Sequence, residues 1–218
     1  MREYLFSESQ KKGAVMRVLI FDTETSGLPV WSSPSDDPMQ PHIAQFTAVI
    51  FDDASGEEEE YVDLIVRQEW PVAPEAFGVH GITPERSIEE GVPEDHAVMF
   101  FEAMSAAADR IAGFSLSFDM RIIRIARLRA GRAKGLLDAE AAVQKAKQFD
   151  VMQKCTALCK IPPTEKMMAT GRKTWKKPTL VEAVRALFGE EMADAHDARG
   201  DVLATKRIYM HLKGLGLA

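Results

Sequence analysis

A short apolar run that leads straight into acidic residues constrains this chain more than any other feature. Residues 18–21 are typical of a buried strand, and Asp22 and Glu24 follow at once. Side chains two positions apart on an extended backbone point to the same side, so these two carboxylates are expected to lie together. Crowded carboxylates repel each other unless a cation lies between them. The pattern indicates a candidate site for Mg²⁺ or Mn²⁺, which prefer carboxylate oxygens. A pair of turn-forming acids that cap the strand is the alternative.

The rest of the chain alternates strand-like and helical patterns. Two strand-like runs, residues 42–51 and 59–66, flank a turn-rich linker at 52–56, which predicts a hairpin. The acidic run at 57–60 is expected to be a solvated strand entrance that protects a sheet edge. Thr83 followed by Pro84 predicts the start of a helix. A single helical turn is expected at 74–79, further helices at 93–109, 119–130, 151–159, 179–188 and 198–212, and a further strand at 110–114. This order implies a mixed β-sheet flanked by α-helices, an α/β domain.

Composition places the chain among ordinary globular proteins. It has 218 residues, 46% hydrophobic and 28% charged, which suits one full-sized core. No apolar stretch approaches the roughly 20 residues that a membrane span requires, and the first residues lack the apolar segment of a secretory signal. Cys155 and Cys159 are expected to be free thiols in a reducing cytoplasm. We therefore expect a cytoplasmic protein with no membrane partner.

The charge is unevenly distributed along the sequence. The formal net charge is −6, yet residues 121–177 hold 15 Lys and Arg against 4 Asp and Glu, a local balance of +11. Such asymmetry suggests a basic face that could meet phosphates. Solvated helix surface explains it equally well, and charge alone does not separate the two interpretations.

Two further acids accompany a histidine. Asp119 follows the expected strand at 110–114 and opens the next helix, where a helix N-cap is the competing interpretation. Asp201 lies in the last expected helix, five residues after His196. A carboxylate for a metal and an imidazole for a proton are the pair that metal-assisted hydrolysis needs. An exposed loop residue is the alternative for His196.

Three segments in this order and spacing resemble the three motifs of the DEDD 3′→5′ exonucleases, in the subclass whose last motif carries histidine. They are residues 22–28 (Asp-Thr-Glu-Thr-Ser-Gly-Leu), Phe118-Asp119, and residues 196–201 (His-x-Ala-x-x-Asp). The proofreading ε-subunit of bacterial DNA polymerase III and phage-type exonucleases are similar members. Segments 74–83 and 177–180 also resemble the family, and the match spans about residues 15–212. In one departure, Phe114-Ser115 stands where the family usually has His-Asn.

The resemblance implies a fold and a reaction. It implies an RNase H-like mixed sheet, with residues 1–14 as an N-terminal extension and 15–218 as a single exonuclease domain. By resemblance, Asp22, Glu24 and Asp201 bind the Mg²⁺ or Mn²⁺ that activates water, and Asp22 with Asp119 orients a second ion. His196 is the general base, since a histidine can be neutral at physiological pH. The implied reaction is hydrolysis of phosphodiester bonds from the 3′ end of DNA, which is expected to be single-stranded. Its products would be nucleoside 5′-monophosphates.

Recognition of the 3′ end is expected to involve residues near these motifs. The residues expected to contact the substrate are Thr23, Thr25, Gly27, Leu28, Glu75, His80 and Ser115. For Leu28, packing in the core is the alternative, and for His80 it is a hydrogen bond within its own turn. The mixture of cations and one tryptophan at 172–177 suits a single strand with a stacked base, or a mobile solvated loop. Asp150 is expected to cap a helix or to support the site without being a ligand.

Other functions remain compatible with the sequence. A 3′→5′ exoribonuclease similar to RNase T or oligoribonuclease would use the same residues, because selection for a 2′-OH depends on pocket shape. A non-catalytic domain that binds nucleic acid or a polymerase is the second alternative, and a metal-dependent phosphatase has no motif support. The expected partner is a nucleic acid with a free 3′ end, DNA rather than RNA, with a DNA polymerase or another replication protein as a possible second partner.

Overall fold

The computed structural model describes residues 16–192 and 198–218, and its centre is a five-stranded sheet. The strands are β1 (Arg17–Thr25), β2 (Ile43–Asp52), β3 (Glu58–Ile65), β4 (Arg110–Gly113) and β5 (Gln148–Asp150). Their order across the sheet is β3-β2-β1-β4-β5. β1, β2 and β3 pair antiparallel, whereas β1, β4 and β5 pair parallel. The predicted mixed sheet and the predicted hairpin, which joins β2 to β3, are confirmed.

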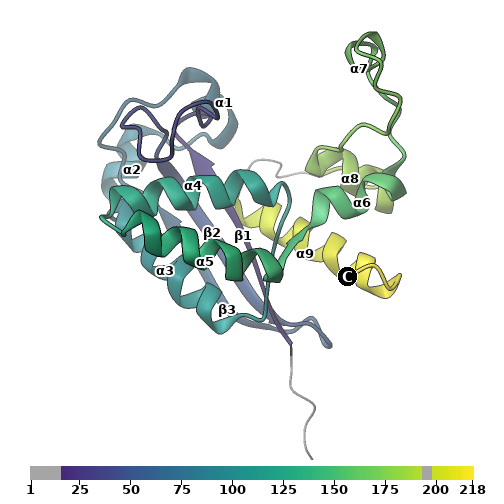
Figure 1. The fold of residues 1–218 in the computed structure, drawn as a ribbon, viewed down its shortest axis with the longest axis horizontal. Coiled ribbons are helices and arrows are strands. Elements are labelled where there is room, and N and C mark those ends of the chain that lie inside the picture. The colour runs from purple at the N-terminus through teal and green to yellow at the C-terminus, as the bar shows by residue number, and fades with distance from the viewer. Residues whose placement is uncertain (1–15, 193–197) are drawn as a thin grey trace, which may run out of the picture.

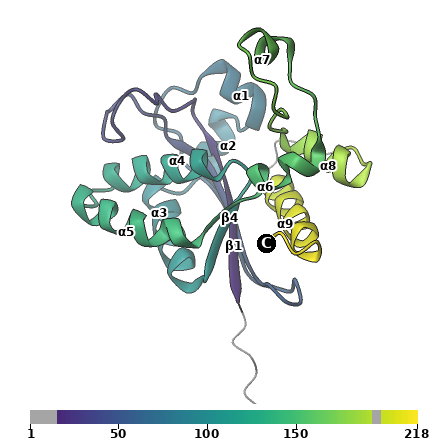
Figure 2. The same ribbon diagram turned by 45° about the vertical axis from the view of Figure 1, so that its right-hand side comes forward.

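Helices cover both faces of the sheet (Figures 1 and 2). They are α1 (Pro74–His80), α2 (Pro84–Glu90), α3 (Glu94–Ala107), α4 (Leu116–Arg129), α5 (Lys134–Lys147), α6 (Val151–Cys159), α7 (Glu165–Ala169), α8 (Leu180–Phe188) and α9 (Ala198–Gly214). α3, α4 and α5 lie on one side, and α6, α8 and α9 on the other. Alternate residues of β1 supply the two cores, with Leu19 and Phe21 facing α3 and α4, and Val18 and Ile20 facing α9. The predicted α/β fold with helices on both faces is therefore confirmed.

Most of the predicted helices and strands are present, and the structure contains three further elements that were not predicted. Thr83 caps α2 by accepting a hydrogen bond from the Arg86 N–H, and Asp150 caps α6 in the same way through Gln153. α5, β5 and α7 were not predicted. α4 begins at Leu116, three residues before the predicted start at Asp119. Among the described helices, none is both long and apolar enough to cross a membrane.

The charged segments are more internally paired than the sequence suggested. The acidic run of the edge strand β3 is held by cations, because Glu58 pairs with Lys206 at 2.7 Å and Glu59 with Arg17 at 2.7 Å. It is therefore more than a solvated strand entrance. The arginines of α4 are similarly engaged, and Arg127 contacts both Glu102 and Glu140. Three arginines of α4 are thus paired with acids of α3 and α5 and contribute less to a free basic face than the sequence suggested. Cys155 and Cys159 are free thiols.

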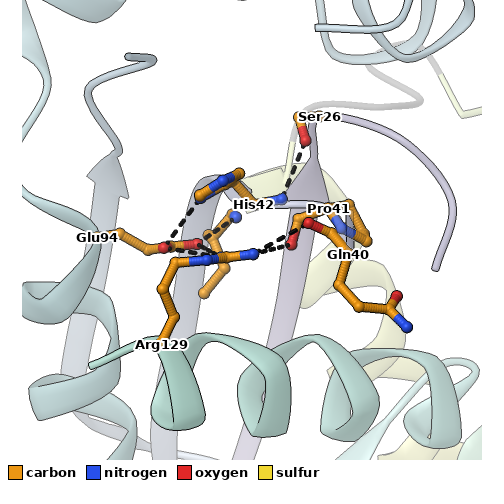
Figure 3. Close-up of polar contacts among 7 residues, drawn as sticks. Ser26, Gln40, Pro41, His42, Glu94 and Arg129 are labelled. Atoms are coloured by element: carbon orange, nitrogen blue, oxygen red, sulfur yellow. Dashed lines mark hydrogen bonds and ion pairs between the residues drawn. The ribbon is translucent and has the colours of Figure 1, made fainter. Parts of the chain in front are cut away.

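A polar cluster anchors the long loop that follows β1 (Figure 3). The Ser26 hydroxyl accepts a hydrogen bond from the His42 backbone N–H at 3.0 Å. Glu94 of α3 contacts the His42 Nδ1 at 3.1 Å and the Arg129 guanidinium of α4 at 3.0 Å. Arg129 also donates to the backbone carbonyl of Gln40 at 3.0 Å. The loop of residues 27–42 is therefore fixed at its start and its end, which positions the residues just beyond the β1 carboxylates.

Candidate metal and nucleotide site

Three carboxylates from two distant parts of the chain meet at the end of β1. Asp22 and Glu24 lie two residues apart on this strand, and Asp201 lies in the first turn of α9. One carboxylate oxygen of each lies within 4.8 Å of the other two. α9 brings Asp201 there because the buried Val202, Ile208 and similar residues pack its apolar face onto the sheet. We refer to Asp22, Glu24 and Asp201 as the carboxylate cluster.

Asp119 lies beside this cluster and is held by Thr23. Its Oδ1 accepts hydrogen bonds from the Thr23 backbone N–H at 3.1 Å and from the Thr23 hydroxyl at 2.8 Å. Asp119 is 3% exposed, and its negative charge raises the pKa of Asp22. The helix start at Leu116 places Asp119 within the first turn of α4, so it is not the N-cap. Parallel pairing of β4 with β1 brings this turn to the same edge of the sheet as Asp22.

The site holds its negative charges poorly. Burial raises the pKa of Asp22 well above its ordinary value, and the charges of Asp119, Glu24 and Asp201 raise it further. Burial also raises the pKa of Asp119 to about 7, although the hydrogen bonds from Thr23 oppose the shift. Nearby negative charge and desolvation both penalise an ionised carboxyl group. A cation would relieve both penalties.

The residues fit hard divalent cations. The donor atoms are carboxylate oxygens, which Mg²⁺ and Mn²⁺ prefer, and the three of the cluster are close enough to share one ion. Asp22, Glu24 and Asp201 would hold such an ion, and Asp22 with Asp119 would hold a second. Metal binding at such a site displaces protons and therefore depends on pH.

A pocket of about 530 Å³ adjoins the carboxylates. Five residues that the sequence proposed as substrate contacts line it, namely Thr23, Thr25, Gly27, Leu28 and Glu75. The Thr25 hydroxyl donates to the Gly27 carbonyl at 2.8 Å, which fixes the turn at the pocket edge. Leu28 is 82% exposed, so its side chain is not packed in the core. The volume is in the range of ordinary small-ligand pockets.

The apolar wall of the pocket was missed in the sequence. It consists of Ala73, Ala76, Val79 and Phe118, together with Leu28. Ala73, Ala76 and Val79 recur every three residues along α1 and the residue before it, which places them on one helix face. This spacing in the sequence could have predicted an apolar helix face. An apolar wall beside carboxylates can hold a planar base next to a phosphate.

His80 and Ser115 do not line this pocket. The His80 Nδ1 accepts a hydrogen bond from the Ile82 N–H at 3.0 Å, within its own turn, and burial lowers the pKa of its imidazole. Ser115 precedes α4 in the left-handed conformation, with φ 76°. Asn adopts this conformation more readily than Ser, which gives a backbone reason for Asn in the resembling family. His196 lies outside the described residues.

Comparisons with known proteins give structural but no sequence matches. No family model matches the chain, and no curated protein matches it. Escherichia coli exonuclease I in complex with a dA16 oligonucleotide has a TM-score of 0.68 and 21% identity over 91% of this chain and 41% of that one. The zinc-bound exonuclease I–ssDNA complex has a TM-score of 0.66 and 22% identity, over 92% of this chain and 41% of that one.

This chain has the fold of exonuclease I. A moderately thermophilic exonuclease I from Methylocaldum szegediense also matches, with a TM-score of 0.61 and 21% identity over 91% of this chain and 40% of that one. The predicted RNase H-like sheet is thereby confirmed. The chain spans about two fifths of the length of these exonuclease I chains. At such identity the likeness establishes the fold alone.

Proposed function

We propose that residues 15–218 form a single DEDD-type exonuclease domain of the histidine subclass. It would use two Mg²⁺ or Mn²⁺ ions to remove nucleotides from the 3′ end of single-stranded DNA. The observation that carries this proposal is the carboxylate cluster, with oxygens within 4.8 Å of one another, beside a pocket with an apolar wall. Exonuclease I structures in complex with dA16 and dT13 oligonucleotides share the fold, which supports DNA as the substrate.

The pocket would position the terminal nucleotide. Its base would lie against Leu28 and Phe118, and its sugar would face Thr25 and Glu75. This orientation would bring the last phosphodiester towards the carboxylates of Asp22 and Glu24. Holding the reacting group in one place removes much of the entropic part of a barrier.

The remaining groups would hold charges and move a proton. When bound, two divalent ions supply the positive charge that stabilises the attacking and leaving oxygens. Thr23 would keep the Asp119 carboxylate oriented through its two hydrogen bonds. His196 would take a proton from the attacking water as the new O–P bond forms and the bond from phosphorus to the 3′ oxygen breaks. The leaving oxygen would take a proton from solvent, and the product would be a nucleoside 5′-monophosphate.

Nuclease assays on a 5′-labelled single-stranded oligonucleotide test the proposal. With Mg²⁺ or Mn²⁺ we expect a ladder of shortened labelled products, and with EDTA no cleavage. Release of the label as a mononucleotide would contradict the 3′→5′ direction. A matched RNA oligonucleotide separates the alternatives, because faster loss of RNA would make the chain an exoribonuclease.

A variant of the cluster separates catalysis from binding. Asp201→Asn is expected to abolish cleavage while the oligonucleotide still binds. Asp36→Asn makes the same change at an exposed position of the 27–42 loop and should leave cleavage as in the wild type. An unchanged rate in Asp201→Asn would remove the metal assignment. If the wild type binds the oligonucleotide but does not cleave it, the non-catalytic alternative is favoured. The next test would then be whether the protein binds a DNA polymerase.

A further inference from the structure

A projecting arm, residues 160–178, connects α6 to α8 and carries α7 at its tip (Figures 1 and 2). Its base is closed by a hydrogen bond from the Lys176 N–H to the Ile161 carbonyl at 3.0 Å. Lys176 also contacts Glu182 of α8 at 2.6 Å. At the tip, the Arg172 N–H donates to the Met167 carbonyl at 2.9 Å. The arm is therefore tied by hydrogen bonds at its base and at its tip.

The arm is strongly basic, and most of its cations lack an acidic neighbour. It contains six Lys and Arg residues and one acid, Glu165. Within the described part of the chain, only Lys176 among these cations forms an ion pair. The arginines of α4 differ, since Arg124 pairs with Asp138 at 2.5 Å and Arg127 with Glu102 at 2.9 Å. The positive charge of the arm is thus available to an external anion.

A groove of about 640 Å³ runs between the arm and α6. It is lined by Gln153, Thr156, Met167, Arg172, Thr174, Trp175, Lys176 and Lys177. Trp175 is 46% exposed, although a large aromatic ring gains most from burial. Cations that follow a backbone and an aromatic ring that accepts a base are the two parts of a single-strand binding surface.

The groove begins at the same edge of the sheet as the carboxylates. Gln153, one of its lining residues, donates to Asp150 through its backbone N–H at 2.8 Å and its side chain at 3.2 Å. Asp150 ends β5 and pairs with Gly113 of β4, and β4 runs parallel to β1. The start of the groove and the carboxylate end of β1 therefore lie along one edge of the sheet. Both views show the arm at this end of the molecule.

We propose that the arm groove binds the single strand a few nucleotides before its 3′ end, with a base stacked on Trp175 and phosphates against Arg172 and Lys177. This inference rests on the proposed function and extends it from the terminal nucleotide to the strand behind it. It predicts that substrates long enough to reach the arm bind more tightly than short ones. An acidic protein segment is the other occupant that the charge would accept.

Anisotropy of a labelled 20-nucleotide dT strand, measured with the full chain in EDTA, tests the proposal. Each phosphate contact to a single strand contributes about 0.7 to the slope of log affinity against log salt. Arg172→Ala with Lys177→Ala should therefore reduce the slope by about 1.4. The control, Lys134→Ala with Lys145→Ala, removes two exposed cations of α5 and should leave the slope unchanged. Equal slopes in the two double variants would overturn the proposal.

Substitutions of Trp175 supply an independent test. Trp175→Ala should weaken binding by about 5- to 150-fold, and Trp175→Phe should restore most of the affinity because an aromatic ring remains. Equal affinities for the two variants would contradict stacking. A polyglutamate peptide that binds in an Arg172- and Lys177-dependent way, while the dT strand does not, would assign the groove to an acidic protein instead.

Cleavage measurements separate this proposal from the proposed function. The arm double variant should lose more activity on the 20-nucleotide strand than on a trinucleotide. If the wild type cleaves nothing but its binding depends on the arm, the nuclease proposal fails and the groove assignment stands. If the wild type cleaves and the arm variant binds and cleaves like it, the groove assignment fails alone.

Discussion

Replacing Asp119 by asparagine should stabilise the metal-free protein at neutral and higher pH. Asp119 is 3% exposed, and burial raises the pKa of its carboxyl group to about 7 from an ordinary value of 3.8. The amide Oδ1 of asparagine can still accept both hydrogen bonds from Thr23. The substitution therefore removes the buried charge and keeps the local contacts. Asp119 would then be a position where the native residue lowers stability because the site needs its charge.

The magnitude and its sign follow from the pKa. A raised native pKa means that the unfolded chain ionises first, so native stability falls as pH rises from about 4 to 7. A shift of roughly three units at 1.36 kcal/mol each gives a ceiling of about 4 kcal/mol. Asp119→Asn should recover about 2 to 4 kcal/mol at pH 8 and much less at pH 5. For a chain of this size the ceiling corresponds to a rise in Tm of about 8 to 16 °C.

Thermal unfolding in EDTA at pH 5 and pH 8 measures this gain. Asp36→Asn, an exposed carboxylate in the 27–42 loop, serves as the control and should shift Tm little at either pH. With Mn²⁺ the stability difference between the variant and the wild type should become smaller. The wild type gains about 2.7 kcal/mol at 100 times the Kd, and the variant gains less. An Asp119→Asn protein that is no more stable than the wild type at pH 8, or equally stabilised at both pH values, would refute the reasoning.

Three further outcomes can be measured in the same way. Ser115→Asn should raise the free energy of unfolding in urea by up to about 1 kcal/mol, because Asn fits the left-handed conformation at φ 76° better; a decrease would show that the serine side chain is needed. The rise in Tm caused by Mn²⁺ should be larger at pH 8 than at pH 5.5, since Asp22, whose pKa is raised, must lose its proton to bind a cation; equal rises would contradict this. Tyr209→Phe should cost about 1 to 2 kcal/mol, because the Tyr209 hydroxyl donates to Asp53 at 2.8 Å and accepts from Arg110 at 2.7 Å; no loss in urea would show that water replaces it.

Local patterns in the sequence were enough to predict most of the longer elements. The apolar run before Asp22 predicted β1, and α6 spans the predicted residues 151–159 because Asp150 caps it. β5 has only three residues, too few for a periodic signal, and it exists because Phe149 pairs with Ala112. α5 was missed because its sequence carries Gly135 near its start, and because Leu137 is the only buried one among the side chains that are described in this helix. Elements defined by tertiary pairing are not legible in one sequence.

The site was predictable to the extent that strand geometry determines it. Alternation along β1 was enough to place Asp22 and Glu24 together. The place of Asp119 depends on where α4 begins, and that start is determined by the left-handed Ser115, which no propensity predicts for serine. The apolar side of the pocket depends on how α1 folds against the end of β1. Such contacts are visible only in three dimensions.

Docking of α9 has a consequence for how the molecule opens. Asp201 enters the carboxylate cluster only while α9 is packed against β1 and β2, whereas Asp22 and Glu24 belong to the sheet itself. An ion bound by all three carboxylates would therefore stabilise the packing of α9 against β1. Amide hydrogen exchange in α9 should then slow when Mn²⁺ is added. The exchange rate of this helix would report how much of the site is occupied by the ion.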